Sequence, residues 1–266
     1  MSDSKGETSF KLHNAPVIEW WIRCNFFPRE DGEPWEWNSA LEFLRQHKDE
    51  LPIEEHLPSI IPQAKPVKDK KTDRLKFEAT VEPAYFRRRT ENSSRSVQVG
   101  RDELVVTQLR TETNVYPGFS KLLADFESYL QQYNDILKPS AIDDIEVHYV
   151  DLVVVPDAAT ENFEITDFLI IGPELPQDPF GSAFHTRWTM SFICPDVRDT
   201  SHFSFDLLPP DGKDIRFRLD WHYICGKLAS DSDESVADRL TIAHNYLNRC
   251  FQKVLKPEVW ELFKPY

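Results

Sequence analysis

Three residue types that together could act on a substrate lie near the end of the chain. His202 and Ser204 share one segment, and Asp220 and His222 share the next. A serine, a histidine and a carboxylate are the groups of a nucleophilic triad, in which the histidine takes the serine proton and the carboxylate orients the histidine. Both segments alternate apolar and polar residues, so each is expected to be a β-strand with its polar side chains on one face.

A turn at 209–212 joins these two segments, and pairing Leu208 with Asp214 across it predicts the hairpin register. Three polar pairs then face each other on one side of the sheet: Asp206 with Arg216, Ser204 with Arg218, and His202 with Asp220. Such pairs commonly stabilise a solvated sheet face, and this is the favoured interpretation. Ser204 also lacks the Gly-x-Ser-x-Gly turn that exposes a nucleophilic serine. A hydrolase or transferase using His202, Ser204, Asp220 and His222 is therefore kept as the alternative.

The remaining metal and cofactor signals are weak. His148, His202 and His222 fall on different expected strands, and the chain has no His-x-x-x-His or Cys-x-x-Cys pair. Such local pairs are typical of zinc sites, so no metal is predicted. The chain has only eight glycines and no glycine-rich phosphate loop, so no cofactor is expected.

A basic segment spans residues 65–110, where twelve lysines or arginines stand against seven acidic residues. Within it, two aromatic residues precede Arg87, Arg88 and Arg89, a combination that suits phosphate contact and base stacking. The chain as a whole carries a net charge of -14, which opposes nucleic-acid binding. We therefore expect Arg87 and Arg89 to lie together at an exposed hairpin end and to bind a protein, which could be a second copy of this chain. A nucleic-acid accessory role is the second alternative.

The elements that must position these residues follow from periodicity. Strands are predicted at 16–27, 75–81, 97–99, 104–109, 145–155, 187–194, 202–207 and 215–223. Helices are predicted at 38–47, 117–137 and 235–255, the last opened by a capping box of Ser235 and Asp238. Two proline-rich stretches are read differently: 51–73 as a flexible connection, and 156–183 as a long excursion that could be a lid. The pattern favours an α+β fold with mainly antiparallel sheet and two long amphipathic helices.

The order of strands followed by a long helix occurs twice. This order suggests two similar halves, 1–140 and 141–266, packed intimately enough to form one domain. We find no residue-level repeat, so the duplication is a topological hypothesis.

Composition bounds the class of protein. Hydrophobic residues make up 40% and charged residues 29% of the 266 residues, as expected for a globular chain. No apolar run approaches the length needed to cross a bilayer, and the polar first residues predict no signal peptide. Four widely spaced cysteines fit reduced thiols. We expect an acidic cytoplasmic protein that does not bind membranes.

Several segments together resemble an uncharacterised family of sporadically distributed bacterial proteins. They are His13–Glu19, Val97–Gly100, Gln108–Arg110, Tyr116–Phe119 and Ile145–Pro156, with the centre His148-Tyr149-Val150-Asp151 where that family commonly has Arg-Tyr-Ile-Asn. The resemblance spans nearly the whole chain and implies no activity or catalytic residues. The patchy distribution of that family suits accessory genes such as defence or toxin–antidote modules. Together with the weak catalytic signals, it favours a non-catalytic protein-binding or regulatory protein.

Overall fold

Nine strands of this computed structural model form one antiparallel sheet in the order β2-β5-β6-β7-β1-β8-β11-β10-β9. The structure describes residues 16–27, 37–60, 65–68, 75–78, 81–100, 102–111, 116–139, 141–156, 166, 168–170, 186–193, 199–226 and 235–263. The strands are β1 Val17–Phe26, β2 Ile53–Ile60, β5 Val81–Arg89, β6 Arg95–Gly100, β7 Glu103–Leu109, β8 Ile142–Val155, β9 Thr186–Ile193, β10 Thr200–Asp211 and β11 Asp214–Cys225. The α+β prediction is therefore confirmed.

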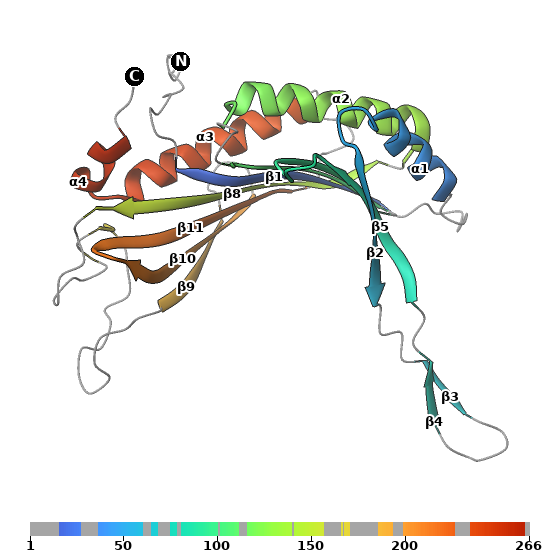
Figure 1. The fold of residues 1–266 in the computed structure, drawn as a ribbon, viewed down its shortest axis with the longest axis horizontal. Coiled ribbons are helices and arrows are strands. Elements are labelled where there is room, and N and C mark those ends of the chain that lie inside the picture. The colour runs from blue at the N-terminus through green and yellow to red at the C-terminus, as the bar shows by residue number, and fades with distance from the viewer. Residues whose placement is uncertain are drawn as a thin grey trace.

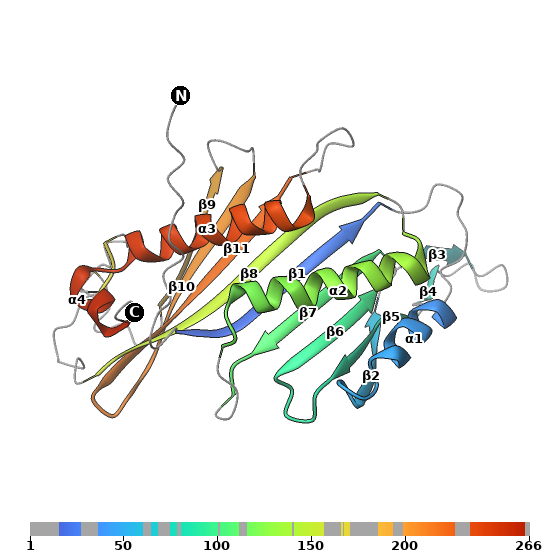
Figure 2. The ribbon, with the colours of Figure 1, turned by 90° about the horizontal axis from the view of Figure 1, so that it is seen from above.

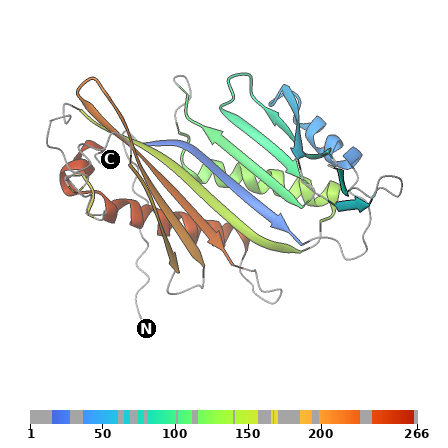
Figure 3. The same cartoon turned by 90° about the horizontal axis from the view of Figure 1, so that it is seen from below.

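Helices α1 Trp37–Gln46, α2 Phe119–Leu137, α3 Val236–Val254 and α4 Pro257–Trp260 lie on one side of the sheet. Figure 1 shows the sheet arched beneath them, and Figure 2 shows α2 and α3 crossing the strands. The opposite, concave side carries no helix of the described chain, as Figure 3 shows from below. The sheet therefore has one apolar, helix-covered face and one helix-free face.

Strand alternation explains this division. Trp20, Ile22 and Cys24 of β1 are buried on the helix side, while Trp21 and Arg23 point to the helix-free side. The same period of two buries Phe203 to Leu207 of β10 and Phe217 to Tyr223 of β11 at alternate positions. The long helices meet this layer with one apolar face each. Those faces include Leu122, Phe126, Tyr133 and Leu137 of α2, and Leu240, Ala243, Leu247 and Phe251 of α3.

The predicted ends of both long helices agree with the structure. Ser235 and Asp238 form the expected reciprocal capping box of α3. Helix α2 begins after Gly118, whose φ of 88° is a conformation that glycine adopts readily. The helix ends at Leu137, and its C-cap Lys138 stands just before a proline. The strands of the N-terminal half lie side by side and meet those of the C-terminal half where β1 pairs with β8. The division into two similar halves stays a prediction.

The proline-rich stretch at 51–73 was predicted wrongly as a flexible connection. It contains β2 and also β3 Lys65–Lys68, which pairs with β4 Leu75–Glu78 in a separate two-stranded sheet. Pro58 is accommodated because β2 is an edge strand whose register shifts beside it. The single strand predicted at 75–81 is divided between β4 and the start of β5. Most of the 156–183 excursion lies outside the described residues.

Candidate functional site

The hairpin of β10 and β11 carries the residues predicted for chemistry, but in a different register. Ser204 lies opposite Asp220, and His202 lies opposite His222. The predicted register was wrong by two residues because the chain turns at Gly212, with a φ of 64°, and the strands continue past the two prolines through an irregularity. A shift of two keeps every side chain on its face, so all four candidates still share the helix-free side.

Ser204 and His202, which would be the nucleophile and the base of a triad, bond other side chains. Ser204 Oγ lies 2.8 Å from Oγ1 of Thr189, and His202 Nδ1 lies 2.8 Å from Oγ of Ser191. Thr189 and Ser191 are both on β9. Asp220 accepts a hydrogen bond of 2.9 Å from Arg218, and its Oδ1 lies 3.5 Å from Nε2 of His148 on β8. The geometry therefore supports cross-strand pairing and does not assemble a serine–histidine–carboxylate relay. The hydrolase or transferase alternative gains no support from these contacts.

Register brings three histidines into one row across the strands. His148 of β8 lies opposite His222 of β11, which lies opposite His202 of β10, and Trp21 of β1 continues the row beyond His148. The ring centroids are 5.9 Å apart for His148 and His222, and 5.7 Å apart for His202 and His222. Trp21 packs on His148 at 4.8 Å. Sequence reasoning missed this row because it depends on β8 pairing with β11, which no local pattern reveals.

The charged groups around the row are also committed to one another. His222 Nε2 lies 2.7 Å from Glu146 Oε2, and Asn25 donates a bond of 2.9 Å to the other oxygen of Glu146. Burial acts to raise the pKa of Glu146, but the bond to His222 and the nearby charge of Arg23 outweigh it, so this pKa lies below its ordinary value. Among the described residues, no group of three His, Cys, Asp or Glu side chains is arranged to hold a metal ion.

Two segments quoted for the family resemblance meet on the helix side of the sheet. Tyr149 lies 2.8 Å from Nδ1 of His244 on α3 and hydrogen-bonds to Tyr116. Asp151 is buried and accepts a bond of 3.0 Å from Trp221 Nε1. Burial raises the pKa of Asp151 to about 7 and lowers that of His244 to about 4. These groups form a buried cluster between the sheet and α3.

The three arginines lie on β5 beside the edge strand β2. Arg87 and Arg89 point to one side and Arg88 to the other, as the alternation of side chains along a strand requires. Both Arg87 and Arg89 hydrogen-bond the carboxylate of Glu55, and Arg88 is buried against Glu54 and the carbonyl of Leu51. Arg87 and Arg89 are thus half-buried and paired within the chain. Their role in binding a partner stays a prediction.

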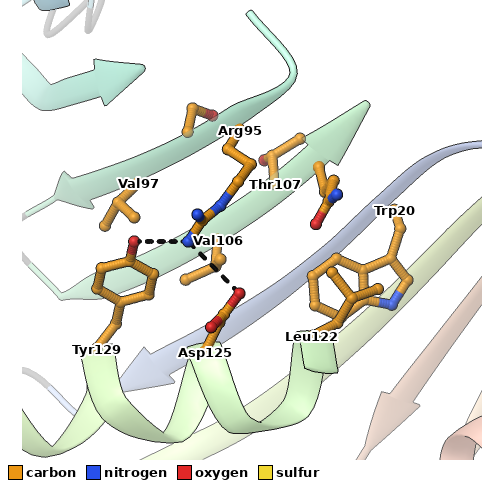
Figure 4. Close-up of a pocket in the computed structure, with 10 residues that line it drawn as sticks. Trp20, Arg95, Val97, Val106, Thr107, Leu122, Asp125 and Tyr129 are labelled. Carbon is orange, nitrogen blue, oxygen red and sulfur yellow. Dashed lines mark hydrogen bonds and ion pairs between the residues drawn. The ribbon is translucent and has the colours of Figure 1, made fainter. Parts of the chain in front are cut away.

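A small crevice opens beneath α2, where Arg95 extends between β6, β7 and the helix (Figure 4). Its cavity volume is about 10 Å³, roughly the space of one water molecule. Arg95 lies 3.4 Å from Asp125 and donates a hydrogen bond of 3.1 Å to the hydroxyl of Tyr129. The crevice is therefore occupied by the chain's own ion pair and is too small for a substrate.

The two ends of the sheet differ in how they are protected. At one end, β2 carries Glu54, Glu55, His56 and Pro58 and has an irregular register. Charges, proline and bulges are the features by which edge strands avoid pairing with other chains. At the other end, β9 reads Thr-Arg-Trp-Thr-Met-Ser-Phe-Ile, with no proline, lysine or acidic residue, and pairs with β10 over eight consecutive positions. In the described part of the chain, no strand lies on the outer side of β9.

The outer end of β9 also exposes apolar side chains. Phe192 is 40% exposed and Ile193 is 79% exposed, and both are among the few large hydrophobic residues at the described surface. An exposed, regular and weakly charged edge strand can accept a strand from another chain. Residues 188–193 carry no charge, which is a signal visible in the sequence, but only the strand order shows that this strand is an edge.

Comparison with known proteins found no family whose pattern matches this chain and no similar curated protein. The resemblance drawn from the sequence therefore stays a prediction. No helix in the described part of the chain is long and apolar enough to cross a membrane.

Proposed function

We propose that this chain is a non-catalytic protein-binding protein that receives a strand of its partner at the edge of β9. The observation that carries the proposal is the contrast between the protected edge β2 and the regular, nearly uncharged edge β9. Backbone N–H and C=O groups on the outer side of β9 supply affinity, and the side chains of Phe192 and Ile193 supply apolar contacts.

The helix-free face supports a binding role over a catalytic one. Its serine, histidine and carboxylate groups are held by one another across the strands, in the manner of a rigid polar surface. A catalytic serine needs its hydroxyl directed to a base, whereas Ser204 bonds Thr189. The polar face thus keeps this end of the sheet ordered, and the edge strand is the part open to a partner.

The test is affinity capture from the native host with matched variants. Phe192→Lys and Ile193→Lys place a charge on the outer strand, where a lysine opposes strand addition. Ile170→Lys makes the same change at a residue that is 59% exposed and whose backbone N–H bonds the carbonyl of Val254 at the end of α3. We expect the same captured protein with the parent and with Ile170→Lys, and its loss with both β9 variants. Capture that is equal in all four proteins would contradict the proposal.

A further inference from the structure

We propose that the strand received by β9 is β9 of a second copy of this chain, paired antiparallel about a two-fold axis at Met190. The inference rests on the proposed function and names its partner. It would join two nine-stranded sheets into one continuous sheet.

The difference between the edges restricts how copies can associate. If β9 of one copy paired with β2 of the next, each added copy would expose another β9, and an open filament would grow. Pro58, which has no backbone N–H, and the shifted register of β2 oppose that contact. Pairing β9 with β9 uses the end of the nine-stranded sheet that lacks these features among the described residues, and it closes after two copies.

The sequence of β9 fits such a pairing. A two-fold axis perpendicular to the sheet keeps corresponding faces together, so opposed residues must have the same parity. With Met190 on the axis, Met190 faces itself and Thr189 faces Ser191 of the other copy. Trp188 then lies opposite Phe192, which places an aromatic pair on each side of the axis. Ile193, the most exposed of these side chains, lies opposite the aliphatic stem of Arg187.

Two copies repel each other less at this edge than over most of their surface, because the edge carries little charge. Two copies that each carry a net charge of -14 repel, whereas β9 contains one formal charge, Arg187. In the proposed register the two Arg187 residues are six positions apart along the strands. That separation is about 20 Å, well beyond the screening length at physiological salt. The edge thus brings the copies together without opposing like charges directly.

The contact is one strand pair, so its area is smaller than the roughly 1,600 Å² of a standard stable interface. We therefore expect a dimer that dissociates in the micromolar range and not a permanent one.

Sedimentation measured at protein concentrations from about 1 to 300 µM should show the mass rising from 31.1 kDa toward twice that value. Phe192→Lys and Ile193→Lys should remain monomeric, and Ile170→Lys should behave as the parent. Circular dichroism of each variant verifies that the fold is retained.

Cross-linking tests the register independently of stability. In a Cys194→Ser background, Met190→Cys places two thiols directly opposite each other on the axis, so oxidation should yield a covalent dimer. Thr189→Cys places them two residues out of register, beyond the distance a disulfide can bridge, and should cross-link far less. Equal cross-linking at both positions would overturn the register.

The result separates the two proposals. A parent that stays monomeric at about 300 µM would overturn the second-copy inference. If capture of a different protein is still lost in the β9 variants, the proposed function stands. If the parent stays monomeric and the β9 variants capture the same proteins as the parent, both proposals are overturned.

Discussion

The two ends of the sheet are built for different purposes. At the β2 end, the arginines of β5 are bonded to Glu54 and Glu55, so the charges of this edge are neutralised within the chain. At the β9 end, Thr189 and Ser191 bond side chains of β10 on the helix-free face, and the outer strand carries exposed Phe192 and Ile193. Both β2 and β9 are end strands among the described residues, but only β9 has the sequence of an edge that can accept another strand.

The ends also differ in how they are held. The β2 end depends on ion pairs that are partly exposed, with Glu55 about one quarter exposed. The β9 end is held by Asp199, which is 1% exposed and accepts bonds from Arg239 of α3, Tyr223 of β11 and the backbone of Gly226. The β9 edge therefore lies on the more firmly anchored part of the sheet. Variants at the two ends should therefore differ in their effects on stability.

The largest effect is expected for Asp199→Ala. It leaves the guanidinium of Arg239 buried without its carboxylate, so the free energy of unfolding should fall by about 3–5 kcal/mol. The measurement is urea denaturation followed by circular dichroism. A double variant, Asp199→Leu with Arg239→Met, removes both charges and should recover much of the loss. A loss below about 1 kcal/mol in Asp199→Ala would show that this end is not held by the buried pair.

The next effect concerns Asp151 on β8, which lies beside the central strand β1 of the sheet. Its pKa is raised to about 7, so the folded protein holds this proton more tightly than the unfolded chain does. Its contribution is fully present below pH 4 and is lost as the pH rises through 7. Asp151→Asn should therefore remove a decline in stability on the order of 3 kcal/mol between pH 4 and pH 8. If the free energy of unfolding of parent and variant depended on pH in the same way, this prediction would be contradicted.

Glu55→Gln probes the β2 end and should have a smaller effect. Hydrogen bonds from Arg89 and Arg87 lower the pKa of Glu55, so its contribution is present above the ordinary carboxylate range and lost as the pH falls. Because these pairs are partly exposed, the loss in the free energy of unfolding should be about 0.5–1 kcal/mol and should shrink in high salt. Thermal unfolding at low and high salt measures it. A loss as large as that of Asp199→Ala would reverse the comparison.

The smallest effect is expected from Arg87→Gln combined with Arg89→Gln. Both guanidinium groups are already bonded to Glu55, so self-association should be unchanged across a salt series. Sedimentation of this variant beside Ile193→Lys compares the two ends directly. Loss of association in the arginine variant alone would restore the interface predicted at the β2 end from the sequence.

The sequence was sufficient for most elements because their signals are local. Alternation of period two located β9, β10 and β11, and the capping box of Ser235 and Asp238 located the start of α3. The same reasoning failed at β2, since Pro58 is a strong breaker unless the strand is an edge.

The candidate site depended on non-local information. The row of His148, His222 and His202 exists because β8, β11 and β10 are neighbours, and strand order is set by packing of the whole sheet. The hairpin register was missed because the chain turns at Gly212 and not within the preceding prolines. The identity of β9 as an edge is likewise a property of the assembled sheet, and no single segment contains it.

Hydrogen exchange at increasing protein concentration tests the contrast between the two edges most directly. Amide groups on the outer side of β9 exchange with water in the separated chain and become protected when another strand pairs with them. The account predicts that protection of 186–193 rises with concentration while that of 53–60 stays constant. Constant exchange along 186–193, or protection that grows along 53–60 instead, would contradict it.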